Sequence, residues 1–515
     1  MLLLLQFKQW VLHRKDNMAE NKKRFPGFVG PAYQSRSERF DCQRLVNMYI
    51  EMDELGAGKG SEPAVLIGTP GLEFLQTIGA GPIRCVYTQG NLQITYVVSG
   101  NQVYAITGAN ATPTLVSGSL LTSSGPVQMA DNGTQAIIVD GQYGFWFDVT
   151  ISSPVLTQLT DVHFHPTDTI TFQDGYFIGV DKGADGNGTG NFFISDLYSI
   201  SFLPLNEANI VASNTGILKA VISCGDLLYM LGSSCVEIWA DVGTSGSTPF
   251  QRQPARISQI GCAAANSVVI LGETIFWLGS NTQGGGIVYT LNNGMPMRIS
   301  NHAIEYAIQK FNDLESATAY SYQQEGHFFY LLNIPGTNTT WVYDNDANQW
   351  HERQSTVNGI TGRHLGNCHA LLNNDHIIGD YSNGNIYRYN LDVYTDNGQV
   401  VNRIRQTPHV SDSLNNIFYK LLEVDMQFGV GLDDISGNGT TPGSNPQIVL
   451  QISNDGGQTW GNPIYATMGK IGQYRTRARW QRLGYSRDRV FRLIISEPVR
   501  VSLLSAMLDV EQGNS

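Results

Sequence analysis

The stretch SNDGGQTW carries the most specific arrangement of polar residues in the chain. It fits the Asp-box pattern Ser-x-Asp-x-Gly-x-Thr-Trp, formed here by Ser453, Asp455, Gly457, Thr459 and Trp460. In such a turn the aspartate accepts backbone N–H groups, the glycines form the tight corner, and the tryptophan packs behind it. The pattern therefore predicts a structural β-turn that carries no chemistry of its own.

The same turn occurs in sialidases, so glycoside hydrolysis is the chemistry that it could accompany. A sialidase also needs a tyrosine nucleophile assisted by a carboxylate, and an arginine cluster that grips the substrate carboxylate. Sialidases usually repeat the box across several blades, whereas this chain has one copy. We favour the structural turn, and a sialidase-like glycosidase or carbohydrate-binding β-propeller remains the alternative.

An arginine-rich stretch, YRTRARWQRLGYSRDRVFRL, follows the Asp-box. Arg475, Arg477 and Arg479 alternate, so a single strand would place all three side chains on one face, and Arg482 continues the bias. One interpretation is a face paired with carboxylates of the same or a neighbouring subunit. The other is a contact with DNA phosphates or with an acidic partner protein.

Other polar clusters lack the spacing that metal or cofactor sites require. His163 and His165 have no third ligand at suitable spacing, and Asp181–Asn191 lacks the closing glutamate of a calcium loop. Gly284–Gly286 do not match the phosphate-binding glycine patterns, and the six scattered cysteines form no Cys-x-x-Cys pair. We therefore expect no metal, no cofactor and no catalytic residues, and predict that the protein is not an enzyme.

The composition favours an all-β chain. Its 515 residues include 55 Gly, 23 Tyr, 21 Phe and 8 Trp, and only 15% are charged. Such a balance is typical of many short strands joined by tight turns. The net charge of −12 argues against a dedicated nucleic-acid binder, although an acidic surface could lie beside DNA and repel it. No membrane-spanning segment is expected, because the leading apolar run is much shorter than the roughly 18–20 residues that a span requires.

The elements that must position these residues divide the chain into four parts. Residues 1–25 form an N-terminal extension or arm, with Met18 as a candidate true start, and residues 26–84 contain strands that could join the C-terminal domain. Over 85–402 a loose repeat of apolar strand, turn and aromatic strand predicts a β-propeller of six or seven blades, with two β-sandwiches as the alternative. Ser300–Asp313 interrupts it with helical spacing. Residues 403–515 form an additional C-terminal β domain.

Three stretches together resemble the packaged-DNA stabilisation proteins, or tail hub (nozzle) proteins, of short-tailed bacteriophages. The first is QRLVNMYIE followed by GTPGL, and the second is VEIWADVGTSGSTPFQRQPARISQIGC. The third and most specific runs from LQISNDGGQTW through MGKIG to RLGYSRDRVFRLIISEPV, and it includes the Asp-box and the arginines. The resemblance spans most of the chain from about residue 40.

The resemblance implies a structural virion protein that works in the phage tail and assembles in the host cytoplasm. Such proteins form a homohexameric ring below the portal and its head-to-tail adaptor ring, and they contact a tail needle or plug and tail spikes or fibres. The ring extends the DNA channel and helps retain packaged DNA until ejection, with transient, non-specific passage of the genome. Under the alternative, a sialidase-like or carbohydrate-binding propeller would act on the host envelope.

Overall fold

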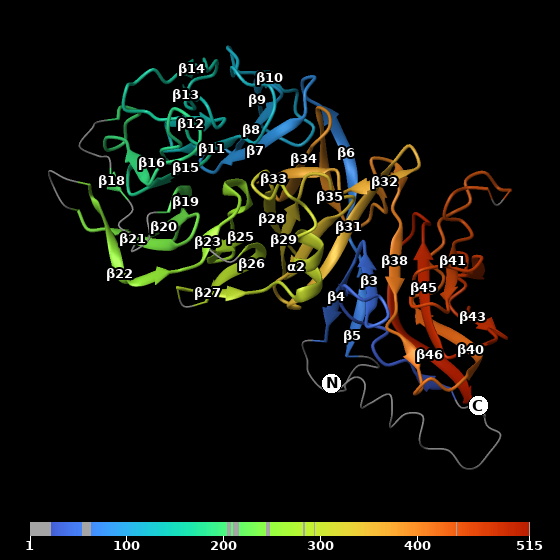
Figure 1. Cartoon of the computed structure of the whole chain (residues 1–515). Coiled ribbons are helices and arrows are strands. Elements are labelled where there is room, and N and C mark those ends of the chain that lie inside the picture. The colour runs from blue at the N-terminus through green and yellow to red at the C-terminus, as the bar shows by residue number, and fades with distance from the viewer. Residues whose placement is uncertain are drawn as a thin grey trace.

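The computed structural model describes residues 22–53, 63–202, 208–209, 216–243, 248–281, 284–292, 294–438 and 440–513. Across these residues the chain is built almost entirely of β-strands, with one short helix, α2 (His302–Ile308), and a 3-10 turn, η2 (Ala265–Ser267). The prediction of an all-β chain is therefore confirmed. Figure 1 shows a ring of small sheets beside a second β domain, which is mostly orange and red but also contains the blue strands β3 (Cys42–Val46), β4 (Met48–Met52) and β5 (Ala64–Gly68). Met18 lies outside the described residues.

Seven small sheets form the blades of a β-propeller within the described part of the chain. Four are separate sheets: β7 (Ile83–Gln89), β8 (Ile94–Ser99), β9 (Gln102–Ile106) and β10 (Thr114–Leu115); β11 (Gln128–Asp131), β12 (Gln135–Val139), β13 (Gly144–Asp148) and β14 (Thr157–Gln158); β15 (Ile170–Gln173), β16 (Tyr176–Val180), β17 (Asn191–Ile194) and β18 (Ala208–Asn209); β19 (Leu218–Cys224), β20 (Leu227–Gly232), β21 (Val236–Asp241) and β22 (Phe250–Ser258). The fifth holds β23 (Gly261–Cys262), β24 (Val269–Leu271), β25 (Thr274–Asn281), β26 (Gly284–Asn292) and β27 (Met295–Arg298). The sixth holds β28 (Thr318–Gln324), β29 (His327–Asn333), β30 (Thr340–Asp344), β31 (Gln349–Val357) and β32 (Ile360–Arg363).

The seventh blade closes the ring with a strand from the beginning of the chain. Its sheet holds β33 (Gly366–Leu372), β34 (Asp375–Asp380), β35 (Asn385–Asn390), β6 (Gly71–Thr77), β36 (Thr395–Asp396) and β37 (Gln399–Val400). β6 pairs antiparallel with β35 from Gly71↔Asn390 to Thr77↔Asn385. A Cβ atom on Gly71 would lie 2.3 Å from the carbonyl oxygen of Val393, so this position requires glycine. The propeller therefore includes β6, which the expected range 85–402 leaves out.

The second domain is a sandwich of two sheets. One sheet holds β1 (Lys23–Arg24), β4 (Met48–Met52), β5 (Ala64–Gly68), β40 (Ile417–Met426), β43 (Ala478–Gln481), β44 (Tyr485–Ser486) and β46 (Ser502–Gln512). The other holds β2 (Tyr33–Gln34), β3 (Cys42–Val46), β38 (Arg403–Gln406), β39 (Val410–Ser411), β41 (Gln447–Ser453), β42 (Ile464–Thr467) and β45 (Asp488–Ile495). Apolar side chains from both sheets, such as Leu66, Leu450 and Leu503, meet in one buried core. Strands of the N-terminal segment thus complete the C-terminal domain.

Helix α2 is shorter than the sequence pattern predicts. Asn301 caps its start by accepting the Ile304 N–H at 3.0 Å. The helix ends at Ile308 rather than near Asp313, and Asp313 accepts the Ser316 N–H in the turn that follows. Among the described residues, no helix is long and apolar enough to cross a membrane.

Candidate functional site: the junction of propeller and sandwich

The short strand β3 joins the two domains. It pairs antiparallel with β38, through Arg44↔Gln406 and Val46↔Ile404, and parallel with β31 of the sixth blade at Val46↔Glu352. One hydrogen-bonded sheet therefore runs from the sixth blade into the sandwich, as Figure 1 shows around β31, β3 and β38. Because backbone hydrogen bonds cross the boundary, the two domains are coupled far more firmly than two domains joined by a linker.

A buried arginine holds the N-terminal segment against this sheet. The Arg405 side chain is fully buried and donates to the carbonyl oxygens of Phe28 at 2.7 Å and Gly27 at 2.8 Å, and to Oε1 of Gln43 at 2.8 Å. Burial lowers the pKa of Arg405 to about 9. The guanidinium group thus donates to several carbonyl oxygens at once. Without it, these buried carbonyl groups would lack hydrogen-bond donors.

An ion pair crosses the same boundary. Arg44 on β3 donates from Nε and Nη2 to the two carboxylate oxygens of Glu352 on β31, at 2.9 and 2.6 Å. Thr339 Oγ1 also donates to Glu352 Oε2, at 3.2 Å. Burial lowers the pKa of Arg44, but the carboxylate more than offsets this and the net shift is upward. The bidentate geometry fixes both the distance and the angle between the strands.

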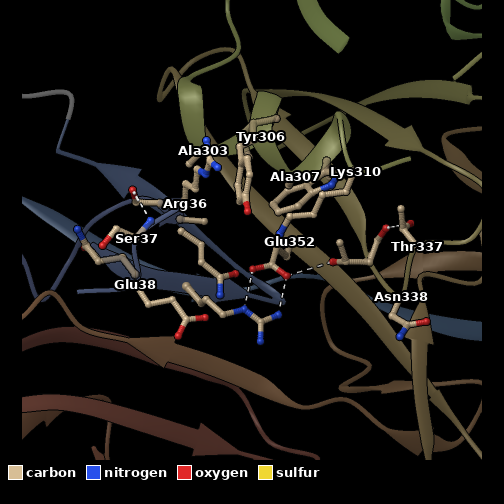
Figure 2. A pocket seen from close by; sticks show the side chains of 18 of the residues that line it. Arg36, Ser37, Glu38, Ala303, Tyr306, Ala307, Lys310, Thr337, Asn338 and Glu352 are labelled. Atoms are coloured by element: carbon tan, nitrogen blue, oxygen red, sulfur yellow. Dashed lines mark hydrogen bonds and ion pairs between the residues drawn. The ribbon is translucent and has the colours of Figure 1, made fainter. Parts of the chain in front are cut away.

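A cavity of 570 Å³ opens beside this ion pair, as Figure 2 shows. Helix α2 and its continuation line one side with Tyr306, Ala307 and Lys310, and the segment that contains Ser37 and Glu38 lines the other. The described residues that line it include no histidine or cysteine. The cavity has the size of a small-ligand site, and its walls combine an apolar helix face with a charged rim.

A cysteine, a histidine and an aspartate meet where the N-terminal segment touches the sandwich. His409 Nδ1 donates to Asp488 Oδ1 at 2.8 Å, its Nε2 donates to the Glu38 carbonyl oxygen at 2.8 Å, and Nε2 lies 3.5 Å from Cys42 Sγ. Burial lowers the pKa of His409, but the bonds to Asp488 and Cys42 more than offset it and raise the pKa to about 10. A protonated histidine that donates from both nitrogens cannot serve as a general base, and the thiol is buried. The cluster therefore works as a clamp.

The Asp-box turn lies directly after β41, beside this clamp. Asp455 accepts the Thr459 N–H at 2.9 Å and the Ser453 hydroxyl at 2.6 Å, and Ser453 Oγ accepts the Gly457 N–H at 2.8 Å. These hydrogen bonds lower the pKa of Asp455 to about 2. Trp460 packs against Arg492, whose guanidinium carbon lies 3.5 Å from the ring centroid. The Ser453, Asp455 and Thr459 side chains bond within the turn itself, as a purely structural role requires.

The arginine-rich stretch does not form the expected strand. Arg475 lies in a turn, Arg477 precedes β43, and Arg479 alone of the three lies on it. The prediction that one strand presents all three on one face is wrong, because Gly469 and Gly472 have left-handed φ values of 86° and 83° and fold the segment into turns.

Two of these arginines contact a carboxylate of the same chain. Arg479 Nε lies 2.9 Å and Arg477 Nη1 lies 3.7 Å from Glu423 Oε1, so these two fit the same-subunit interpretation. Arg475 and Arg482 are exposed on the sandwich.

Several polar groups that the sequence analysis did not single out come together only in the folded structure. His409, held by Asp488, contacts Cys42, which lies 367 residues before it in the chain, so no local spacing predicts the arrangement. Of the groups set aside on sequence grounds, His165 lies 3.7 Å from Asp181, and all six cysteines are free thiols.

Comparison with known families identifies the chain. The family model described as Bacteriophage P22 Gp10, beta-propeller, matches residues 24–394, and the model described as Bacteriophage P22 Gp10, beta-sandwich, matches residues 402–511. No curated protein matches the chain. Among solved structures, the N-terminal domain of Nup159 aligns with 9% identity over 67% of this chain and 98% of that one, with a TM-score of 0.39, a level of similarity too low to assign a shared fold. The two family models together cover nearly all of the chain, which therefore belongs to the bacteriophage P22 Gp10 family of propeller-and-sandwich phage structural proteins.

Proposed function

We propose that this protein is a subunit of a tail hub, or nozzle, ring that lies below the portal and its adaptor and extends the DNA channel. In this role it helps to retain the packaged genome until ejection, and it has no enzymatic activity. The observation that carries the proposal is the family match over both domains, residues 24–394 and 402–511.

The physical properties of the chain suit such a ring. A net charge of −12 repels DNA phosphates, so a wall built from this protein would let DNA slide without adhering. The continuous sheet through β3 gives each subunit a fixed shape. Closing a homohexamer requires that one face of each subunit meets a different face of its neighbour. The same ring would present surfaces to the adaptor, to a tail needle or plug, and to spikes or fibres.

Particle reconstruction and DNA retention test the proposal together. Phage particles made without this protein should fill with DNA and then lose it, and adding the purified protein should restore retention, measured as nuclease-resistant DNA per particle. Electron microscopy of complete particles should place the chain in a sixfold ring of the tail. A monomer absent from the particle that hydrolyses a fluorogenic sialoside would instead establish the glycosidase alternative, which acts on the host envelope.

The exposed arginines offer a more local test of assembly. Arg475→Glu combined with Arg482→Glu should block ring formation or docking, because two negative charges would face the carboxylates of the proposed neighbour or adaptor contact. Both side chains are exposed on the sandwich, so the change should leave the core intact. Arg500→Glu is the control, since it reverses another exposed charge of the same domain. Reversal of Arg477 and Arg479 should block assembly too, but it also breaks the contacts with Glu423, so its thermal stability must be measured beside its assembly. If the Arg475→Glu, Arg482→Glu variant still gives normal particles, these two residues do not take part in an essential interface.

A further inference from the structure

We propose that His327, Asp344 and Asp346 form a binding site for one divalent transition-metal ion of the Zn²⁺ type, at the boundary between the sixth blade and the sandwich. Each residue offers one ligand atom, and these atoms all lie within 4.8 Å of one another in the described part of the chain. One imidazole nitrogen and two carboxylate oxygens are a ligand set that Zn²⁺ accepts, with water filling the remaining position.

The strand pairing of the blade brings the three ligands together. His327 is the first residue of β29 and Asp344 is the last residue of β30, and these strands run antiparallel with Phe329 opposite Asp344. The turn after β30 then brings Asp346 back, where its Oδ2 accepts the Phe328 N–H at 2.8 Å. All three positions are therefore fixed by backbone structure, as a preformed site requires.

A fourth residue orients the imidazole. Nε2 of His327 donates to Glu51 Oε2 at 2.8 Å, and Nδ1 donates to Asp344 Oδ2 at 2.7 Å. An ion bound at Nδ1 replaces that proton, which is released to solvent, while the contact with Glu51 keeps its N–H. A carboxylate that accepts the far N–H of a metal-binding histidine is the usual supporting contact of such sites. The ring is also held by Phe329, stacked at 5.6 Å between centroids, and by the edge of Tyr49 at 5.0 Å.

The His327–Asp344 pair needs only a small adjustment to admit an ion, and the Asp346 carboxylate lies within 4.8 Å of both ligand atoms. Two ligands that each lie about 2.1 Å from Zn²⁺ are separated by roughly 3.0–3.4 Å, so the 2.7 Å contact between His327 and Asp344 needs to open by only a few tenths of an ångström. Asp344 uses Oδ1 for the N–H groups of Asp346 and Ala347, at 3.1 and 3.3 Å, and keeps Oδ2 for the ion. Asp344 is buried, but Asp346 is exposed and provides the path from solvent.

The position gives the ion a structural effect. Glu51 belongs to β4 of the sandwich, whereas the three ligands belong to the sixth blade. An ion at Nδ1 makes His327 a stronger donor towards Glu51, and so strengthens a contact across the domain boundary. Binding should therefore raise the thermal unfolding midpoint of the full chain.

Calorimetric titration of the full, chelator-treated chain with ZnCl₂ tests the site. We expect one Zn²⁺ per chain and a higher unfolding midpoint in its presence. Asp346→Asn should weaken binding at least about tenfold, and Glu51→Gln about 10- to 100-fold. The amide oxygen introduced by Asp346→Asn can still accept the Phe328 N–H, so the turn should fold as before. Glu325→Gln is the matched control, because Glu325 lies on the turn that leads into β29 and provides no ligand.

The outcomes separate the proposal from its alternatives. Loss of affinity in Asp346→Asn with wild-type affinity in Glu325→Gln supports the site. Equal affinity in all variants, or the same loss in both, would show that Zn²⁺ binds elsewhere or only through surface charge. Failure of the folded wild-type chain to bind Zn²⁺ saturably would leave the cluster as a histidine held between carboxylates, and would leave the tail role unaffected.

Discussion

The Arg44–Glu352 pair should be the main polar lock between propeller and sandwich. Its two charge-assisted hydrogen bonds measure 2.9 and 2.6 Å, and 5% of the Glu352 side chain is exposed against 24% of Arg44. Such bonds contribute about 1.5–3 kcal/mol each. At the more exposed Arg44, competing hydrogen bonds to water reduce this contribution. We therefore expect a coupling free energy of about 2 kcal/mol between the two side chains.

Hydrogen exchange at Asn47 reports on this lock directly, because its backbone N–H donates to the Glu352 carbonyl oxygen at 2.8 Å. A loss of about 2 kcal/mol in the local opening free energy corresponds to a fall of about 30-fold in amide protection. The experiment is a double-mutant cycle with Arg44→Gln, Glu352→Gln and the combined variant. Local opening is the right quantity, since a chain of two domains need not unfold in a single step.

A cycle without coupling would show that the Arg44–Glu352 pair does not lock the joint. Protection at Asn47 within about twofold of wild type in both single variants would mean that the sheet hydrogen bonds alone hold the joint. Strictly additive losses would mean that each side chain contributes through other contacts, such as the one from Thr339 to Glu352.

Three further perturbations follow from the described contacts. Asp455→Ala removes the acceptor of the Thr459 N–H and should lower the stability of the sandwich by about 1 kcal/mol in urea unfolding, as loss of a comparable capping side chain does. The pKa of His409 is about 10 in the fold against about 6.5 unfolded. Its contribution to the free energy of unfolding is therefore fully present below about pH 6.5 and is lost as the pH rises to about 10. The unfolding midpoint should fall over that window, and Asp488→Asn should flatten the fall. Arg405→Met strands several buried carbonyl groups and should cost about 4 kcal/mol, seen as faster proteolysis of the N-terminal segment.

Local patterns predict the elements of this protein better than their assembly. The repeated pattern of short apolar strands and turns indicates an all-β propeller, and the Asp-box residues form the expected turn. Both depend on neighbours within a few residues, so the sequence can reveal them. The placement of β6 in the seventh blade could not be derived this way, since its partner β35 is more than 300 residues distant.

The polar sites illustrate the same limit. Alternation at Arg475, Arg477 and Arg479 predicts a strand only if the backbone is extended, and the left-handed glycines before them prevent that. Glu51 and His327 are 276 residues apart, so no spacing in the sequence connects them. Signals for such sites exist only once the topology is known.

The closure of the ring by β6 has a consequence for quality control during synthesis. Gly71 leaves the ribosome early, but its partner Asn390 is made more than 300 residues later, so a nascent or truncated chain is an open arc with bare strand edges at both ends. We expect cellular proteases to degrade such fragments. Once the chain has been translated through β35, pairing of β35 with β6 covers both open strand edges at once. We therefore expect truncated chains to be degraded faster than full-length ones.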